Sequence, residues 1–319
     1  MAEFFHRRLH RWVLTALLIS VAAGAGASIA ADKEKPHIVV LVSYDAPPYR
    51  DALKGFQQAL AQRGIDAIVD VHGLAGDAQN AARVLKEAKR DDVRLVLTLG
   101  MVATRAALTE NPGLPVVAGL ILNADVLEMG SNATGVVLEL PVQLQFEWMQ
   151  RVLPPSTRIG VLYNPAENEQ RVSDAQRIAH EDGFELIPFR VSGPQALPSA
   201  LDRAVNRMDA LWAIPDSLVV SPETAKTLLL FSFRNRVPMI GLSSAWVKAG
   251  ALFALDWDYE DTGMQCAELA AKVLMGARPG GITPVAARRI TYAVNLKTAR
   301  EMRVGLSESL IKGASQVFE

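Results

Sequence analysis

The 319-residue chain has a single cysteine, Cys266, and aromatic residues make up only 6% of it. An intramolecular disulfide is therefore excluded, and a lone cysteine in a helical pattern is most often a small buried hydrophobe. No charge of one sign dominates, because 33 Lys and Arg residues face 34 Asp and Glu residues. This balance gives no electrostatic basis for binding nucleic acid or an anionic membrane.

Sequence signatures of common enzymes are also missing. The chain contains no Gly-x-Gly-x-x-Gly after its first expected strand, no phosphate-binding Gly-x-x-x-x-Gly-Lys-[Ser/Thr], no His-Glu-x-x-His and no Gly-x-Ser-x-Gly. Beyond the first thirty residues the histidines are His37, His72 and His180, and none lies near another or near Cys266. We therefore expect no metal site, no cofactor and no enzymatic activity.

The N-terminal thirty residues have the three-part layout of a secretory signal. Arginines precede the apolar run Trp12–Ala23, and a small-residue segment follows in which Ser28 and Ala30 suit signal cleavage. The apolar run is well short of the ~20 residues needed to span a bilayer. We expect residues 1–30 to be a cleaved signal peptide and the protein to be periplasmic, with a retained anchor as the alternative.

Short runs rich in Val, Ile and Leu alternate with helix-period segments through the rest of the chain. The expected strands are 37–44, 65–71, 93–100, 114–122, 157–164, 184–191, 209–216 and 237–244. Continuous apolar strands that alternate with amphipathic helices are typical of parallel sheets covered on both faces. The fold predicted is α/β, with two Rossmann-like lobes whose parallel sheets are joined by hinge strands.

The alternating pattern restarts near residue 141, which sets the lobe boundaries. The end of the chain adds an expected strand at 250–258, an expected helix at 259–277, a further expected strand at 287–295 and a helical tail. A segment left over after two complete lobes is expected to cross back between them. We assign residues 36–140 and about 250–285 to the first lobe, and residues 141–249 and about 286–319 to the second.

Candidate binding residues follow from the rule that open parallel sheets bind ligands beyond the carboxyl ends of their strands. In the first lobe these residues are Ser43, Tyr44, Tyr49, Gly100, Met101 and Asn123. In the second lobe they are Glu169, Gln170, Asp216, Ser217, Ser243 and Trp246. Two such rims would form a cleft, where small-ligand sites tend to occur. The aromatic side chains there, with Trp257, would stack on a flat ligand or serve ordinary packing.

The segment VLYNPAENEQ (161–170) has a structural explanation of its own. Asn164 is a favoured N-cap, Pro165 suits the first helical position, and Glu167 stands where a capping box places its carboxylate. Its first part is therefore predicted to be a helix start. Glu169 and Gln170, further along, are the stronger candidates for ligand contact.

Several segments resemble the ABC-transporter substrate-binding proteins, in a group that includes tryptophan- and tyrosine-binding members. These segments are GFQQALAQRG, IGVLYNPAE, the Asp of IPDS, GALFALDWDYEDTGMQCAELAAKVLMGARP and VNLKTAREM. The resemblance covers about 36–319. It implies a type I periplasmic-binding-protein fold, a small molecule clamped between the lobes, and a monomer that delivers it to an ABC permease and ATPase at the inner membrane.

The chain departs from the usual residues of that family on the expected rims. Gly100-Met101 replaces Gly-Thr, NADV at 123–126 replaces Asp-Pro-Val, Asn-Glu-Gln at 168–170 replaces x-Asn-Ser, and Ser217 replaces Asn. Asp216 would still serve a ligand ammonium, whereas the Thr hydroxyl that would help to hold a carboxylate is missing, and an inward-facing glutamate would repel a carboxylate. We expect a small polar or amino-acid-like ligand that differs from the aromatic amino acids.

Two other classes of function stay open. A ligand-sensing or interaction protein of the same fold would present its surface to a membrane receptor or sensor kinase. An α/β enzyme with two Rossmann-like lobes, such as a glycosyltransferase, would turn over a nucleotide-sugar. Neighbouring genes for a permease and ATPase would favour transport, and an adjacent sensor-kinase gene would favour signalling.

Overall fold

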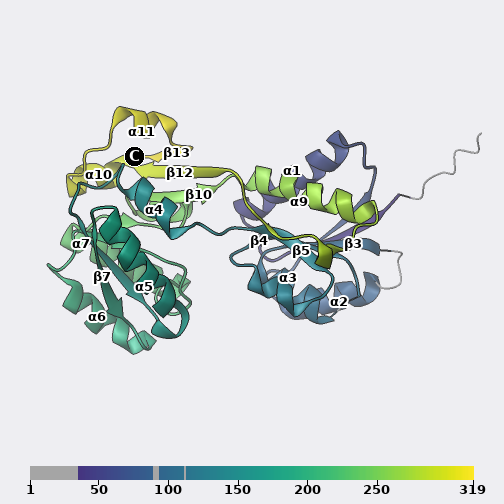
Figure 1. The fold of residues 1–319 in the computed structure, drawn as a ribbon, viewed down its shortest axis with the longest axis horizontal. Helices are drawn as coiled ribbons and strands as arrows, with labels where there is room; N and C mark the ends of the chain where they lie inside the picture. The colour runs from purple at the N-terminus through teal and green to yellow at the C-terminus, as the bar shows by residue number, and fades with distance from the viewer. Residues whose placement is uncertain (1–34, 89–92, 111–112) are drawn as a thin grey trace, which may run out of the picture. The chain divides into compact units, whose positions relative to one another are not determined.

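The structure is a computed structural model that describes residues 35–88, 93–110 and 113–319. The expected signal peptide lies outside these residues. Pro36–Glu319 form one structural unit, which contains two α/β lobes (Figure 1). Each lobe is built on its own sheet, and the parallel order of strands agrees with the predicted fold class.

The sheet of the first lobe is parallel throughout and has the order β11-β5-β4-β3-β1-β2. Its strands are β1 (His37–Val42), β2 (Ile68–Gly73), β3 (Val93–Leu99), β4 (Val116–Ile121), β5 (Ala133–Val137) and β11 (Val285–Ala286). The central strands β1, β3 and β4 are buried along almost their whole length. Burial on both faces explains why they read as unbroken apolar runs.

Helices cover both faces of this first sheet. They are α1 (Pro47–Gln62), α2 (Ala78–Ala88), α3 (Met101–Glu110) and α9 (Tyr259–Leu274), with the 3₁₀ turns η1 (Asp125–Met129) and η3 (Pro279–Gly281). Apolar residues of α1 and α9 pack in one core cluster, and those of α2 and α3 pack in another on the opposite face (Figure 1). Gly64, which follows α1, has a φ of +67°, as expected for the residue that ends a helix.

The sheet of the second lobe has the order β13-β12-β10-β9-β8-β6-β7. Its strands are β6 (Arg158–Tyr163), β7 (Glu185–Arg190), β8 (Ala210–Trp212), β9 (Met239–Ile240), β10 (Phe253–Trp257), β12 (Ile290–Asn295) and β13 (Gln316–Phe318). Only the pairing of β10 with β12 is antiparallel among the described strands of this sheet.

The helices of the second lobe include the one that begins in VLYNPAENEQ. They are α4 (Val142–Met149), α5 (Pro165–Glu181), α6 (Leu197–Ala204), α7 (Pro222–Asn235), α8 (Ser244–Ala249), α10 (Leu296–Met302) and α11 (Glu308–Gly313), with η2 (Pro194–Ala196). Residues of α4 and α5 share one core cluster, while α6 and α7 contribute to a second. Both faces of the sheet are therefore covered.

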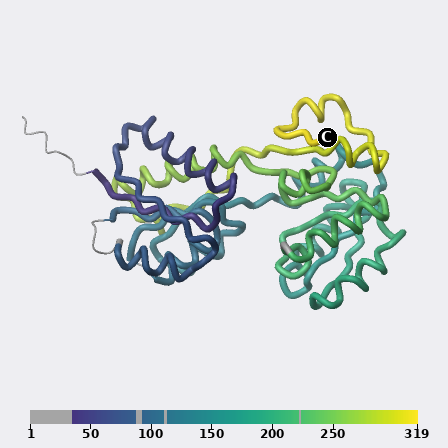
Figure 2. The backbone as a smooth tube through the Cα atoms, turned by 180° about the vertical axis from the view of Figure 1, so that it is seen from behind, coloured from purple at the N-terminus to yellow at the C-terminus, as the bar shows by residue number. Residues whose placement is uncertain are grey.

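The chain passes between the two sheets at 138–141, at Asp258 and at 287–289, and these passages can be followed in Figure 2. The passage at Asp258 differs from the boundary that was expected near residue 250. Strand β10 pairs along its whole length with β12, from Phe253 opposite Val294 to Trp257 opposite Ile290, so it belongs to the second sheet. The crossing comes after Trp257, where α9 begins and packs on α1.

Strand positions differ from expectation where burial is weak or a proline intervenes. Strand β2, expected at 65–71, is an edge strand with mostly exposed residues, so its apolar pattern marks its limits poorly. The run 209–216 yields only the short β8: Ala213 still donates its N–H to Ile240 O at 3.0 Å, but Pro215 has no N–H to continue the ladder. Strands β5, β11 and β13 were not among the expected strands.

The buried face between α1 and α9 depends on small residues. A Cβ on Gly263 would lie 1.9 Å from the Ala52 carbonyl oxygen, and one on Gly55 would lie 1.9 Å from that of Glu260. Cys266, on the same helix as Gly263, is fully buried, as expected, and burial raises the pKa of its thiol to about 12. The helix backbones thus approach too closely for a methyl group at either glycine.

Gly263→Ala is expected to lower the free energy of unfolding by about 1–3 kcal/mol, because the added methyl overlaps backbone that cannot move independently. Urea denaturation followed by circular dichroism measures this change. Gly305→Ala is the control, because a Cβ there meets nothing within 4 Å. Equal stabilities for the two variants would contradict the close packing of α1 on α9.

Candidate functional site

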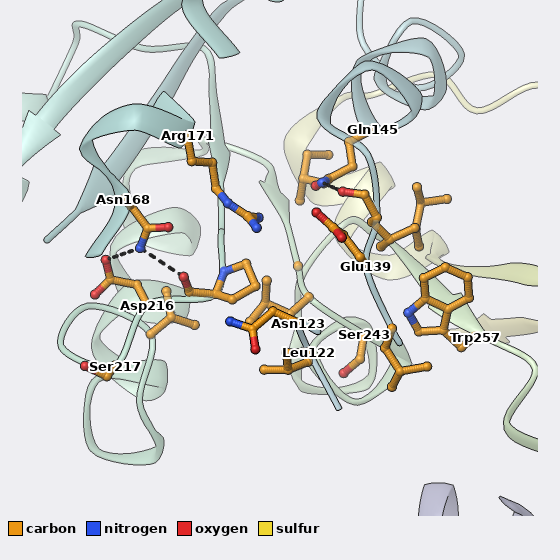
Figure 3. Close-up of a pocket in the computed structure, with 18 of the residues that line it drawn as sticks. Leu122, Asn123, Glu139, Gln145, Asn168, Arg171, Asp216, Ser217, Ser243 and Trp257 are labelled. Carbon is orange, nitrogen blue, oxygen red and sulfur yellow. Dashed lines mark hydrogen bonds between the residues drawn. The ribbon is translucent and has the colours of Figure 1, made fainter. Parts of the chain in front are cut away.

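A cavity of about 920 Å³ lies where strands of both sheets end (Figure 3). The first lobe contributes the residues after β4, part of α3, and the segment 138–140. The second lobe contributes the first turns of α5, the loops 215–217 and 241–243 that follow β8 and β9, and residues of β10. The position agrees with the rule for open parallel sheets.

The start of α5 is organised around Asn164, the N-cap. Its side-chain oxygen accepts from the N–H of Ala166 at 3.1 Å, and Pro165 occupies the first helical position, as predicted. The expected capping box is not formed. Glu167 instead accepts from the N–H of Ser217 at 2.9 Å, and also from the Ser217 hydroxyl. The N–H of Asn164, which a capping box would use, donates to Asp216.

Asp216 is 6% exposed and its carboxylate is saturated with hydrogen bonds. One oxygen accepts from the N–H of Asn164 at 2.7 Å and from the Asn168 amide at 2.9 Å. The other accepts from the N–H of Leu218 at 3.0 Å and of Val219 at 2.8 Å. A buried carboxylate requires such donors. In this arrangement Asp216 fastens the loop after β8 to the start of α5, so a ligand ammonium would have to displace an existing donor.

Asn168, 5% exposed, has its amide orientation fixed by two acceptors (Figure 3). Its NH₂ group donates to Pro215 O at 3.0 Å and to the Asp216 carboxylate at 2.9 Å. Because both neighbours are acceptors only, the nitrogen must face them and the Oδ1 atom must face away. Within the described ranges no donor reaches this Oδ1, although Asn168 lines the cavity.

Three charged side chains reach the cavity without a partner inside the protein. Arg171 of α5, Arg105 of α3 and Glu139 of the crossing segment line it, and Figure 3 shows the Arg171 guanidinium and the Glu139 carboxylate projecting into the space. Among residues 35–88, 93–110 and 113–319, none forms a hydrogen bond or ion pair with these three side chains. Their charges are available to a ligand.

The opposite part of the lining is apolar and rigidly held. Phe253, Leu255 and Trp257 of β10 contribute to it, followed by Tyr259 at the start of α9. Burial raises the pKa of the Tyr259 hydroxyl, and the nearby Asp256 carboxylate raises it further. The hydroxyl therefore stays protonated and donates to Asp256 at 2.6 Å, which fixes the ring.

Some of the residues expected from the sequence meet at the cavity. These are Met101, Asn123, Asp216, Ser217 and Ser243. They come from strand ends in both lobes, where the sheet rule placed them. Trp257, expected as a stacking residue, also lines the cavity, although it is 8% exposed.

Ser43, Tyr44, Tyr49 and Gly100 lie outside the cavity lining and contact one another or α3 instead. The Ser43 hydroxyl accepts from the N–H of Ala103 at 3.0 Å in the first turn of α3. The rings of Tyr44 and Tyr49 meet edge to face, with centroids 6.0 Å apart. Gly100 has a φ of +93°, and a Cβ there would lie 2.8 Å from the Tyr49 ring. These contacts assign them a framework role.

Glu169 and Gln170 also lie outside the lining, contrary to expectation. Glu169 pairs with Arg190 and accepts from the Tyr163 hydroxyl, so its charge does not face a ligand. Gln170 donates to Asp174 at 3.1 Å. The cause is helical geometry: successive residues turn by about 100°, so the face of α5 that carries residues 167, 168 and 171 excludes 169 and 170.

Trp246, the remaining expected contact, packs against Gly241 and the core cluster that contains α6 and α7. Four further residues line the cavity although the strand ends did not predict them: Arg105, Glu139, Asn168 and Arg171. For Asn168 and Arg171 a usable pattern was present, because they stand four and seven residues after the N-cap Asn164 and therefore share its face. Glu139 had no such pattern, because it follows a strand that was not predicted.

Neither a metal-binding cluster nor a membrane-spanning helix occurs in the described part of the chain. No group of His, Cys, Asp and Glu residues there is arranged to hold a metal ion. Within the same residues, no helix combines the length and apolar character needed to span a bilayer.

Asp216→Asn is expected to lower the free energy of unfolding by about 2–4 kcal/mol. In either orientation its amide nitrogen would face two donors, the Asn164 N–H and Asn168 NH₂ or the N–H groups of Leu218 and Val219, and leave them unpaired. Urea denaturation measures the change. Gln170→Ala, which removes only an exposed contact with Asp174, should stay within about 0.5 kcal/mol of the parent. If the Asp216→Asn protein were as stable as Gln170→Ala, Asp216 would not be what fastens the loop after β8 to the start of α5.

Several known proteins are similar to this chain over most of its length. The chain is 24% identical over 287 residues to the tyrosine-binding protein of Clostridioides difficile, and the match covers 85% of this chain and 81% of that protein. An ABC domain from Streptococcus pneumonia, solved with L-Trp, is 23% identical with a TM-score of 0.68, and the match covers 89% of this chain and 100% of that one.

A second solved structure is that of a substrate-binding protein with adhesive properties from Clostridium difficile, in its ligand-free, open form. It is 19% identical with a TM-score of 0.75, and the match covers 89% of this chain and 99% of that one. These likenesses show the type I periplasmic-binding-protein fold. The model of the family described as ABC transporter substrate binding protein matches residues 37–318. The chain therefore belongs to the family of ABC transporter substrate-binding proteins.

Proposed function

We propose that the protein captures a small polar or amino-acid-like molecule in the cavity between its lobes and delivers it to an ABC permease. The main support for this proposal is that the cavity contains three charged side chains, Arg171, Arg105 and Glu139, that have no partner among the described residues. Charges left unpaired in a concave, largely apolar site are a recurrent feature of small-ligand binding.

The place and partners of this function are further parts of the proposal. The secretory layout of residues 1–30 supports a periplasmic protein, and membership of the family supports an ABC permease with its ATPase as partners. We propose that the protein acts as a monomer and has no catalytic activity of its own. Ligand contacts to both lobes would stabilise a closed form by a hinge motion.

We also propose that the ligand differs from the aromatic amino acids named for the relatives. Met101, Asn123 and Ser217 line the cavity at places where the chain departs from its family's usual residues. A thioether offers no hydroxyl to a ligand carboxylate where a threonine is usual. The ligand chemistry is therefore expected to depend on other side chains of this chain.

A thermal-shift screen of the purified protein against amino acids, sugars, nucleosides and small organic acids tests the proposed function. A compound present at a hundred times its dissociation constant should stabilise the protein by about 2.7 kcal/mol, which is readily detected. We expect at least one compound to do so, and we expect L-tryptophan and L-tyrosine to show no micromolar binding by calorimetry.

The capture of a solute and the change of ligand can be refuted independently of each other. A screen in which no compound shifts the melting temperature would contradict solute capture and favour the sensory or interaction protein. Micromolar binding of L-tryptophan or L-tyrosine would leave capture intact but would refute the proposed change of ligand.

A further inference from the structure

Two of the passages between the lobes, at Asp258 and at 287–289, are hydrogen-bonded to each other. Strand β10 pairs with β12 as far as Trp257 opposite Ile290, and the N–H of Asp258 then donates to Arg289 O at 3.1 Å. Because the two passages are joined at this point, a hinge motion of the lobes must bend both of them in the same place.

The passage at 287–289 is fastened to the first lobe as far as Arg288. The side chain of Gln265, on α9, donates to Ala286 O at 3.1 Å and accepts from the N–H of Arg288 at 3.1 Å. The Arg288 guanidinium also pairs with the buried carboxylate of Asp261 at 2.9 Å. Bending in this passage is therefore confined to the backbone between Arg288 and the start of β12.

The passage at Asp258 is fastened to the first lobe in a similar way. Asp258 is the N-cap of α9, and its carboxylate accepts from the N–H of Asp261 at 2.9 Å. Its carbonyl oxygen accepts from the N–H of Thr262 at 2.9 Å. The preceding residue, Trp257, is the last residue of β10 in the second sheet. Bending in this passage is therefore confined to the junction between Trp257 and Asp258.

A side-chain hydrogen bond spans this junction. The Tyr259 hydroxyl, at the start of α9, donates to Asp256 of β10 at 2.6 Å. The Asp256 carboxylate is 5% exposed, and it also accepts from the N–H of Ser244 at 2.7 Å and of Trp257 at 2.8 Å. Ser244 and Trp257 belong to the second lobe. Within the described ranges, Tyr259 is thus the one donor that the first lobe gives to this buried carboxylate.

The rims of the cavity stand apart in the conformation that contains this hydrogen bond. The cavity measures about 920 Å³, and Arg171 and Glu139 both line it. Despite their opposite charges they do not pair with each other, nor does Arg171 pair with another carboxylate among the residues that the structure describes. A hinge motion that closes the lobes would bring such side chains together or onto a ligand.

We propose that the hydrogen bond from Tyr259 to Asp256 is a latch that holds the rims apart and breaks when the lobes close. Closure turns α9 against β10 at the Trp257–Asp258 junction, which withdraws the hydroxyl from the carboxylate. Closure then carries the cost of a buried carboxylate that has lost a donor. The latch therefore lowers the apparent affinity of the cavity and opposes closure without a ligand. This inference goes beyond the proposed function, because it also concerns the protein without a ligand.

Tyr259→Phe tests the latch, because it removes the hydroxyl and keeps the ring. The probe is the compound that gives the largest thermal shift in the screen, and calorimetry measures its binding to the parent and the variant. The variant should bind this compound about fivefold or more tightly, because closure no longer breaks a hydrogen bond. If Tyr259 only supported the fold or only contacted the compound, its truncation would weaken binding instead.

Tyr163→Phe is the matched control. The Tyr163 hydroxyl likewise donates to a carboxylate, that of Glu169 at 3.1 Å, but both residues belong to the second lobe and lie outside the cavity lining. This control should bind the compound as the parent does. Small-angle X-ray scattering from the proteins without ligand adds a second readout. Tyr259→Phe should have a smaller radius of gyration than the parent and Tyr163→Phe.

Binding by Tyr259→Phe that is equal to or weaker than that of the parent would overturn the latch and leave solute capture standing. An equal gain in affinity in Tyr163→Phe would also overturn it, because the effect would then not depend on the hinge. A screen without any binding compound would refute the proposed function. The scattering would then decide the latch by itself, and equal radii of gyration would overturn it.

Discussion

The buried carboxylate of Asp216 sets the geometry on which the binding site depends. Removing a charge from water is costly unless donors replace the lost hydration, and here four N–H groups do so. These donors come from the start of α5 and from the loop after β8, so a single side chain fixes two elements. As a consequence the amide of Asn168 has one permitted orientation, with its oxygen toward the cavity.

The charges in the cavity have a different status from those around Asp216. Arg171, Arg105 and Glu139 take no part in holding the fold together within the described residues. A stable core elsewhere permits this, since the sheets of both lobes are covered on both faces. Charges that contribute nothing to folding are free to discriminate between ligands, which is the task of a substrate-binding protein.

Much of the fold could be predicted from the sequence because it follows from burial. Strands such as β3 and β4 are apolar throughout, and the signals at Asn164, Pro165 and Gly64 mark helix limits correctly. The crossing near residue 250 was misplaced because β10 is as apolar as its neighbours. Its sheet is decided by pairing with β12, a contact between residues far apart in the chain.

The candidate site was harder to predict than the fold. The positions of the strand ends predicted Met101, Asn123 and Asp216, which line the cavity. Which residues of the helix after a strand face the cavity depends instead on the 3.6-residue helical repeat. Glu169 and Gln170 therefore lie outside the cavity lining, while Arg171, on the face of α5 that lines the cavity, was not among the expected residues. The role of Asp216 depends on hydrogen bonds from four residues, which no local pattern reveals.

The central claim is that this cavity captures a small ligand through the side chains of Arg171, Arg105 and Glu139, which have no partner among the described residues. A crystal structure of the protein with the most tightly bound compound of the screen tests it most directly. The account predicts a ligand bound in the cavity with a polar or charged group within about 2.7–3.2 Å of at least one of these three side chains. A ligand bound elsewhere on the protein, or bound in the cavity without touching any of these side chains, would contradict it.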